Sequence, residues 1–436
     1  MTKYRVLSLF SGAGGLDVGL ERTGRFRTIA CLEVEQAFCA TLRRNRDSGR
    51  LGDARTEIIR ADICSTDPGE VMSRLGLRVG ELDLLAGGPP CQSYSTAGRR
   101  ATIQDRRGML LWQYLRFIQA LQPRFFLMEN VRGLLSAAMR HRPIKDRPER
   151  GGPPLEAHEQ PGSVVAMWLT DMMRDLSGAY RVDCFEVNAV NYGAPQLRER
   201  VLFVGNRVGQ VVDFPDPTHG DEPGLLPYST LGHALDTVGH KDDSAILDFS
   251  PRKRGYLAMV PEGGNWRALP LAIQQQSMGR AWMAKGGRSG WWRRLTRDLP
   301  CPTIVTMPNH AGTSMCHPVE TRALTLKECA AVQEFPPDWE FVGTVQQKYT
   351  QVGNAIPTRL GEVAGRVIAD HLDSLNIRSS LKPTRQAENR RVYIQSHVRT
   401  RQWYRDGETF LWSTNGDNKL ARYSARGRHR REAKAV

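Results

Sequence analysis

Short apolar runs alternate with amphipathic stretches along the first 205 residues of the chain. Residues 35–45 and 109–122 repeat apolar side chains at the spacing of an α-helix, and the apolar runs between such stretches have the length of buried strands. The runs that predict strands are residues 5–10, 27–34, 57–63, 82–87, 124–129, 180–188 and 200–205. Strands that alternate with helices are typical of a parallel sheet covered by helices. We therefore predict an α/β domain over residues 1–205.

The regular alternation stops after this domain. Residues 206–320 are rich in Gly, Pro and Trp, which predicts a smaller, irregular domain. Helical periodicity returns at 324–335 and 358–375, so we expect residues 321–375 to rejoin the first domain. Within the first domain, the Pro-, Gly- and Arg-rich stretch 140–162 predicts a long loop.

Residues 376–436 form a C-terminal extension of different composition. Asp406-Gly407 and Asn415-Gly416 lie between aromatic residues and predict a small β-hairpin unit. The extension holds 15 Lys and Arg but only 5 Asp and Glu, whereas the whole chain has a formal net charge of +15. Positive charge of this kind favours a polyanionic partner such as nucleic acid, and we expect the extension to bind phosphates without sequence preference.

Several classes of protein are disfavoured by composition. The chain has no apolar run near the ~18 residues that a membrane span needs, and no signal-peptide pattern. Its eight cysteines form no CxxC pair, so a zinc site is not expected. We expect a cytoplasmic, monomeric protein with reduced thiols and no bound metal.

A glycine-rich turn, FSGAGGLDVGLE, follows the first predicted strand. Gly12 and Gly14 fit the first two glycines of the dinucleotide-binding fingerprint, but Asp17 stands where a pyrophosphate needs the third. Glu33 ends the second strand, where an acid would bind ribose hydroxyls, and Asp62-Ile63 ends the third. Ligands bind at this edge of an open parallel sheet, so the pattern favours a nucleoside without phosphates, such as S-adenosylmethionine.

The fourth predicted strand ends in GGPPC. Pro89 and Pro90 fix the backbone and remove two N–H donors, so Cys91 stands on a rigid turn. The fifth strand ends in Glu129. A thiol and a carboxyl group are therefore expected at the same edge as the nucleoside, which suits nucleophilic catalysis.

Six motifs, in this order, resemble those of the DNA (cytosine-5)-methyltransferases. They are FSGAGGLDVGLE, GGPPCQSYS, MENVRGLL, QLRER, RALTLKECAAVQEFPPDW and YTQVGNAIPTRLG. One departure is Glu334 in QEFP, where the family usually has Gly. The resemblance implies a Rossmann-like fold that depends on S-adenosylmethionine, with residues 206–320 as a target-recognition domain.

The resemblance also implies roles for single residues. Cys91 would add to C6 of a cytosine, which makes C5 nucleophilic enough to take a methyl group. Glu129 would contact ring N3 and supply a proton or hydrogen bond, and Arg200 would hold the ring O2, with Arg198 nearby. The cofactor residues implied are Phe10, Gly12, Gly14, Glu33, Asp62, Ile63, Pro89, Leu110 and Asn354.

A cytosine inside a duplex must be flipped out before it can react. Residues 93–108 resemble the family's mobile loop, which closes over the substrate and grips phosphates. Arg and Trp are dense in residues 250–297, and arginine reads guanine edges in the major groove. The predicted DNA contacts are Ser95, Arg99, Arg100 and Arg107 in the loop and Arg252, Arg254, Arg288, Arg293 and Arg294 in the recognition domain.

Two alternatives stay open at this point: a tRNA cytosine-5 methyltransferase, and a non-catalytic DNA-binding regulator on a methylase scaffold. Asp17 disfavours a dehydrogenase, and Pro-Pro-Cys stands where an amino-methylating enzyme needs an Asp/Asn-Pro-Pro-aromatic motif. The resemblance also implies a bacterial restriction–modification setting, in which the enzyme protects host DNA from a cognate endonuclease.

Overall fold

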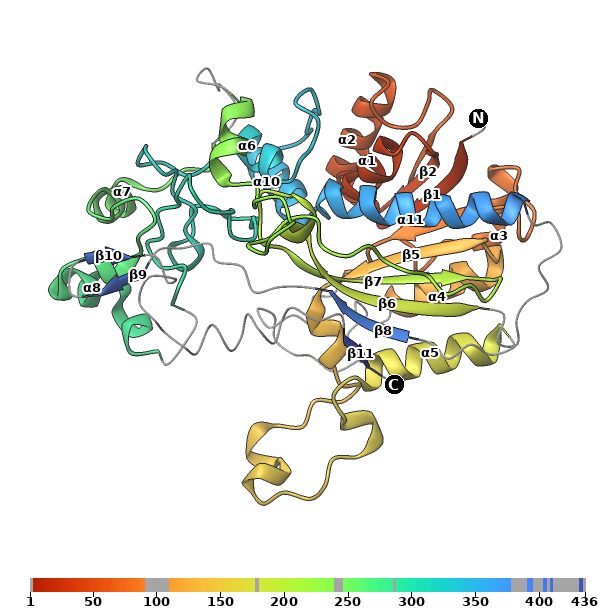
Figure 1. Ribbon diagram of the computed structural model, residues 1–436, viewed down its shortest axis with the longest axis horizontal. Helices are drawn as coiled ribbons and strands as arrows, with labels where there is room; N and C mark the ends of the chain where they lie inside the picture. The colour runs from red at the N-terminus through yellow and green to blue at the C-terminus, as the bar shows by residue number, and fades with distance from the viewer. Residues whose placement is uncertain are drawn as a thin grey trace.

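The computed structural model describes residues 3–90, 110–176, 180–238, 246–284 and 288–377, and four strands of the C-terminal extension. Its main sheet has nine strands in the order β11-β8-β6-β7-β5-β4-β1-β2-β3 (Figure 1). The strands are β1 (Tyr4–Leu9), β2 (Phe26–Glu33), β3 (Glu57–Arg60), β4 (Leu84–Gly87), β5 (Phe125–Asn130), β6 (Arg181–Asn188), β7 (Glu199–Asn206), β8 (Arg390–Ile394) and β11 (Arg431–Ala433). Each of the seven strands that the hydrophobic pattern predicted is present.

The direction of one strand differs from the prediction. β1 to β5 pair in parallel, but β7 lies between β5 and β6 and is antiparallel to both. Only a short loop joins the end of β6 to β7, and parallel neighbours would need a longer crossover. The start of β7 therefore lies at the edge of the sheet where β5 ends.

Alternate side chains of each strand enter two separate cores. Leu7, Leu85 and Phe126 pack against α4 (Leu110–Leu121) and α5 (Ser163–Asp175) on one face. Val6, Leu84 and Phe125 pack on the other face against α1 (Gly15–Arg22) and α11 (Thr358–Ile377). Two further helices, α2 (Gln36–Asp47) and α3 (Pro68–Arg74), follow β2 and β3.

Glycine allows α1 and α11 to approach closely. A Cβ at Gly19 would lie 2.1 Å from the carbonyl oxygen of Thr358 and 2.8 Å from Cα of Gly361. This close approach holds α11 against α1, the helix that follows the glycine-rich turn (Figure 1).

After β7 ends at Asn206, residues 207–320 hold short helices and extended segments but no strand of the main sheet among those described. The helices are α6 (Leu231–Val238), α7 (Pro251–Ala258) and α8 (Leu271–Met278). Backbone hydrogen bonds join residues 290–295 to residues 263–266 on one side and to residues 311–316 on the other. The chain then returns through α9 (Leu326–Val332) and α10 (Val345–Asn354) to α11.

The C-terminal extension contributes to the main sheet. β8 pairs in parallel with β6, with Ile394 opposite Val187, and β11 pairs antiparallel with β8. β9 (Trp403–Arg405) and β10 (Glu408–Phe410) form a two-stranded antiparallel sheet, as expected for a β-hairpin, while the predicted turn Asp406-Gly407 itself lies outside the described residues. The second predicted turn, at Asn415-Gly416, also lies outside the described residues.

Across the described ranges, no helix is both long enough and apolar enough to cross a membrane. Residues 140–162 form a long loop, as their composition predicted. The loop contains three short 3-10 turns, η2 (Ile144–Asp146), η3 (Pro148–Arg150) and η4 (Ala157–Glu159). Its base is closed by the ion pair between Arg142 and the buried Glu159.

The unusual Glu334 follows α9 with a positive φ of 60°. This left-handed conformation suits glycine, which explains why glycine is expected there. Its carboxylate pairs with Arg359 at 2.7 Å, and its carbonyl oxygen accepts hydrogen bonds from Arg22 and Thr358. The ion pair offsets backbone strain of roughly 1–2 kcal/mol.

Two substitutions separate the stabilising ion pair with Arg359 from the destabilising backbone strain at Glu334. Glu334→Ala loses the ion pair but keeps the strain, whereas Glu334→Gly loses the ion pair and relieves the strain. We expect the Gly variant to have a free energy of unfolding roughly 1 kcal/mol higher than the Ala variant, measured by urea denaturation. Equal stability of the two variants would contradict a strained Glu334.

Asp17 is fully buried beneath the glycine-rich turn. Its Oδ2 accepts a hydrogen bond from Ser8 Oγ at 3.0 Å, and its Oδ1 has no partner among the described residues. Burial raises the pKa of this carboxyl to about 7, and the nearby Glu21 adds to the effect. In the unfolded chain the group ionises near pH ~4. The folded protein therefore loses stability as the pH rises from about 4 to about 7.

Asp17→Asn should remove this loss, because an amide oxygen can still accept from Ser8 and carries no charge. We expect the stability of the variant relative to wild type to improve by about 1–3 kcal/mol between pH 5 and pH 8, measured by urea denaturation. Asp47→Asn, at an exposed position, controls for the removal of a negative charge. An identical Asp17→Asn effect at both pH values would show that Asp17 does not titrate in this interval.

Candidate active site

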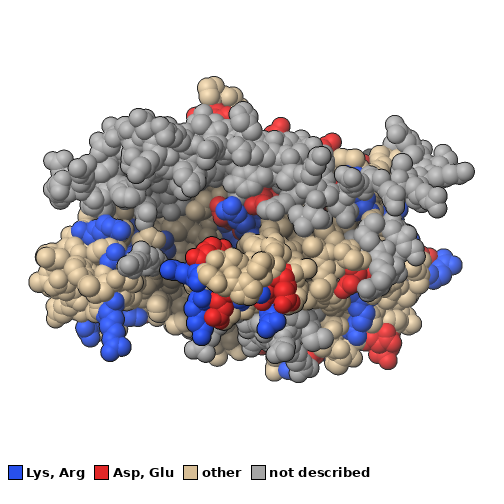
Figure 2. All heavy atoms as spheres, turned by 90° about the horizontal axis from the view of Figure 1, so that it is seen from below, with Lys and Arg blue, Asp and Glu red and all other residues tan. Residues whose placement is uncertain are grey.

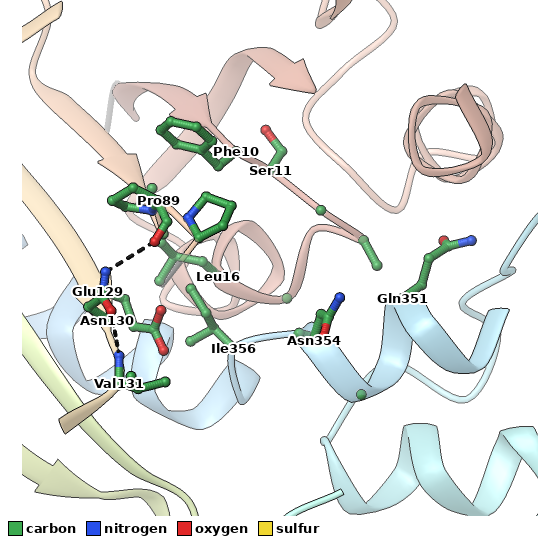
Figure 3. A pocket seen from close by; sticks show the side chains of 18 of the residues that line it. Phe10, Ser11, Leu16, Pro89, Glu129, Asn130, Val131, Gln351, Asn354 and Ile356 are labelled. Carbon is green, nitrogen blue, oxygen red and sulfur yellow. Dashed lines mark hydrogen bonds between the residues drawn. The ribbon is translucent and has the colours of Figure 1, made fainter. Parts of the chain in front are cut away.

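A cleft of about 1980 Å³ opens at the edge of the sheet where β1, β2, β3, β4 and β5 end. The start of β7, residues 303–306 and the end of α10 close its other side. Figure 3 shows Phe10, Pro89, Glu129 and Asn354 around this common space, each from a different segment, with Ile356 directly after Asn354. The cleft therefore gathers segments that are far apart in the sequence.

The glycine-rich turn forms one wall of the cleft. Phe10 has a φ of 53°, a strained value for a bulky side chain, and Gly12 has a φ of 57°. A Cβ at Gly12 would meet only the carbonyl oxygen of Phe10, at 4.0 Å, so the space beside the turn is open to a ligand. Gly14 is not among the lining residues, and its missing Cβ makes room for Leu42 and Trp339. Its role in the structure is to cap α1 rather than to face the cleft.

Glu33 holds the turn in place from the end of β2. Its Oε2 accepts a hydrogen bond from the Gly12 amide at 2.8 Å, and Oε1 accepts from the amides of Val34 and Glu35. Burial raises the pKa of this carboxyl, and these backbone hydrogen bonds oppose the rise. Asp62 and Ile63 line the cleft at the end of β3, where Asp62 Oδ1 accepts from the Cys64 amide at 2.9 Å.

The turn that leads to Cys91 lies directly beside Glu129. A Cβ at Gly88 would be 3.0 Å from Glu129 Oε2, so only glycine allows this approach without a shift. Asn130 Nδ2 donates to the Pro89 carbonyl oxygen at 3.0 Å and so ties the turn to β5 (Figure 3). Gly88 and Asn130 belong to two of the motifs quoted above, but the sequence pattern did not mark either of them as a site residue.

The nucleophile candidate itself lies outside the described residues, which stop at Pro90 and resume at Leu110. Ser95, Arg99, Arg100 and Arg107 lie in the same interval. Pro89, Pro90 and Leu110 all line the cleft, so both ends of the interval are at its rim. Asn354 is an exposed residue of the lining at the end of α10.

Glu129 and Arg200 form an ion pair inside the cleft. Their side chains are 10% and 12% exposed, and Arg200 Nη1 also donates to the Glu199 carbonyl oxygen at 2.7 Å. The pairing of β5 with β7, which sets Asn130 opposite Val201, brings the two residues together. A carboxyl group and a guanidinium group are thus held ready to contact two edges of one planar ring.

Arg198 is buried and has a different set of partners. Nη1 donates to the Ile304 carbonyl oxygen at 3.2 Å and Nη2 to the Gly353 carbonyl oxygen at 3.0 Å. Arg198 therefore ties the start of β7 to α10 and to residue 304, which lies in residues 206–320, referred to as the recognition segment after its predicted role. This supports a positioning role rather than direct contact with a base.

The predicted DNA contacts of residues 250–297 differ in their surroundings. Arg252 is exposed and lies near Tyr256, and Arg254 pairs with Asp248. Arg293 donates from Nε to the Ser314 carbonyl oxygen at 3.0 Å. Arg288 lies over the ring of Trp266.

The prediction that Arg294 contacts DNA is wrong, because its side chain is 5% exposed and is not available to DNA in this structure. Its guanidinium donates to the carbonyl oxygens of Leu257 and Val260, to Thr321 Oγ1 and to the carbonyl oxygens of residues 317–320. It therefore holds two loops of the recognition segment together. Arginine density in the sequence could not distinguish this interior residue from its exposed neighbours.

Comparison with known proteins agrees with this geometry. The chain matches the family described as C-5 cytosine-specific DNA methylase over residues 4–146 and 158–370. It is 32% identical to the Type II methyltransferase M.Sau96I of Staphylococcus aureus over 86% of this chain and 77% of the relative. It is 35% identical to M.PspPI of Psychrobacter sp. (85% and 80%) and 33% identical to M.Eco47II of Escherichia coli (86% and 81%).

A solved structure shows the same fold. It is a prophage-encoded E. coli protein described as a DNA modification methyltransferase, with a TM-score of 0.56 and 22% identity, and the match covers 86% of this chain and all of that one. The fold is thus that of the Rossmann-like methyltransferases that depend on S-adenosylmethionine. With the family match spanning most of its length, the chain belongs to the C-5 cytosine-specific DNA methylases and is a DNA (cytosine-5)-methyltransferase.

Proposed function

We propose that the protein transfers a methyl group from S-adenosylmethionine to C5 of one cytosine in a specific duplex DNA sequence, through base flipping and a transient Cys91–C6 bond. The observation that carries this proposal is the Glu129–Arg200 ion pair inside the cleft, beside the rigid turn that ends at Cys91. The relatives named above are Type II methyltransferases, which supports a role in a restriction–modification system with a cognate endonuclease. We further propose that the enzyme acts as a monomer.

The residues of the cleft fit the cofactor. When bound, S-adenosylmethionine supplies an electrophilic methyl group. Glu33 would accept from ribose hydroxyls, while Asp62, Ile63 and Phe10 would surround the adenine ring. Asn354, Pro89 and Leu110 would contact the rest of the cofactor. The open space beside Gly12 supports this assignment, because a side chain at that position would intrude into it.

The flipped cytosine would lie over the Glu129–Arg200 pair. The Cys91 thiolate forms a bond to C6, and the negative charge that develops on the ring is spread over N3 and O2. The Glu129 carboxylate, which is paired with Arg200 before the base enters, must first take up a proton from solvent; the resulting carboxyl group then donates a proton or hydrogen bond to N3, and the Arg200 guanidinium donates to O2. After C5 gains the methyl group, it loses its proton to a base, and the electron pair expels the Cys91 sulfur from C6.

Duplex DNA must give up stacking and pairing to place a base in this cleft, at a cost of a few kcal/mol. We propose that residues 93–108 contact the phosphates around the gap, and that residues 206–320 select the sequence. Arg252, Arg254, Arg288 and Arg293 remain candidates for DNA contact, while Arg294 does not. The C-terminal extension adds phosphate contacts that do not depend on sequence.

The central test uses duplex DNA that contains 5-fluorocytosine at the target, which blocks loss of the C5 substituent. We expect wild-type protein to be trapped on it as a covalent adduct through Cys91, identified by peptide mass spectrometry. Bisulfite sequencing of DNA from expressing cells first gives the target. An adduct formed on tRNA but not on duplex DNA would contradict the DNA substrate.

Cys91→Ser should abolish methyl transfer, because a hydroxyl adds to C6 far more slowly than a thiolate. Binding of S-adenosylmethionine, measured by calorimetry, should change by less than about threefold, since the cofactor contacts are elsewhere. Cys316→Ser, a buried cysteine of the recognition segment, is the matched control for loss of a thiol. Turnover retained by Cys91→Ser would exclude Cys91 as the nucleophile.

The phosphate-binding role of the extension is tested by charge rather than by deletion, because a deletion from residue 379 would also remove β8 and β11 from the sheet. Arg399, Arg401, Arg422, Arg426 and Arg428 lie between those two strands and can be replaced together by Gln. We expect the slope of log K against log salt for duplex DNA to become shallower by about one unit per lost phosphate contact. An unchanged slope would show that the extension does not contact phosphates.

A further inference from the structure

The arginines of the recognition segment are not equivalent. Arg294 is buried among carbonyl oxygens, Arg293 donates to Ser314, and Arg254 and Arg297 pair with Asp248 and Asp236. Arg267 and Arg288 instead share one aromatic partner, the indole ring of Trp266. The guanidinium carbon of Arg267 is 4.6 Å from the ring centroid and that of Arg288 is 4.9 Å from it.

The position of Trp266, over which these two guanidinium groups lie, is fixed by its own burial and hydrogen bonds. It is 7% exposed, and its amide donates to the Trp291 carbonyl oxygen at 3.0 Å. Asn265, directly before it, accepts from the Arg267 amide at 3.0 Å and caps the short helix η6 (Trp266–Ala268). Arg288 is further held by a hydrogen bond to the Trp282 carbonyl oxygen.

This stack is rich in donors. A guanidinium group that lies against an aromatic face keeps its N–H bonds in its own plane, directed past the ring edge. Arg288 forms no ion pair with any carboxylate in the described part of the chain. The indole Nε1–H of Trp266 is buried and finds no acceptor among the described residues. Arg288 therefore has guanidinium N–H groups that can meet an acceptor outside the chain, whereas the indole N–H of Trp266 is too deeply buried to do so.

The stack is joined to the wall of the cleft by hydrogen-bonded segments. Residues 263–266 bond to 290–295, which bond to 311–316, and the Met315 amide donates to the Pro308 carbonyl oxygen at 3.0 Å. Residues 303–306 of the same unit line the cleft. Seen from below, Lys and Arg side chains lie on the surface of this lobe (Figure 2).

We propose that Arg267 and Arg288, whose guanidinium groups lie over the Trp266 ring, read guanine in the target sequence through the O6 and N7 acceptors of its major-groove edge. This inference rests on the proposed function, and it names the residues that set the sequence preference. Guanine is the base that offers two acceptors at the spacing of a guanidinium fork. Stacking on Trp266 fixes the fork before binding, so that less side-chain entropy is lost on contact.

The experiment replaces each guanine of the target in turn by 7-deazaguanine, which lacks the N7 acceptor, and measures kcat/KM for methylation. We expect wild-type enzyme to lose about 10- to 100-fold at one or two guanines. Arg288→Gln and Arg267→Gln should each be slower on unmodified DNA and insensitive to one of these replacements. Trp266→Phe should show a smaller loss in the same direction, because the ring remains but binds guanidinium more weakly.

Arg280→Ala is the matched control, since Arg280 is an exposed arginine of the same segment outside the stack. It should retain the wild-type pattern of sensitivity to 7-deazaguanine. Binding of S-adenosylmethionine, measured for every variant, confirms that the catalytic lobe is intact.

Two results would overturn the inference while the proposed function stands. One is an Arg288→Gln enzyme with undiminished sensitivity to 7-deazaguanine at every position. The other is an equal loss on all sequences together with a shallower salt dependence, which would make the stack a phosphate contact. Wild-type protein that methylates no cytosine would instead overturn the proposed function, and this inference with it.

Discussion

The antiparallel pairing of β7 with β5 is the constraint on which the candidate active site depends. In a parallel sheet only the carboxyl ends of strands meet at the ligand edge, so a residue at the start of a strand would lie on the opposite side of the molecule. Because β7 is reversed, Arg200 at its start reaches the same edge as Glu129 at the end of β5. The carboxyl group and the guanidinium group pair with little exposure to water, which strengthens their mutual attraction and fixes both side chains. β6 and β8 extend the sheet on the far side of β7.

Two buried arginines, Arg198 and Arg294, are held by backbone carbonyl oxygens. A buried guanidinium group is costly unless its five donors are satisfied, and backbone carbonyl oxygens are an alternative to a carboxylate partner. Arg294 follows this solution inside the recognition segment, and Arg198 follows it between β7, residue 304 and α10. Arg198 connects two segments that line the cleft, whereas Arg294 connects residues 257–260 to residues 317–321, away from it. Arg288 differs from both, because it lies over the Trp266 ring and forms no ion pair with a carboxylate in the described part of the chain.

The cofactor side of the cleft shows strain at a functional position. Phe10 adopts a left-handed backbone conformation that costs of order 1–3 kcal/mol for such a residue. The hydrogen bond from the Gly12 amide to Glu33 and the packing of α1 against α11 hold the turn in this shape. The same turn covers Asp17, whose buried carboxyl is a further cost. These costs are met by the two large cores on either side of the sheet.

The sequence alone determined the strands, their order along the chain and several of the residues that line the cleft, because strand periodicity and turn chemistry are local properties. Glu129, Glu33 and Asp62 could be placed at one edge because each ends an apolar run. The family resemblance carried the roles of these residues further than their spacing could. The sequence did not determine the direction of β7, the interior position of Arg294, the location of Gly14 outside the cleft lining or the pairing of β8 with β6. Each of these depends on which distant segments pack together, and that is decided by the tertiary structure.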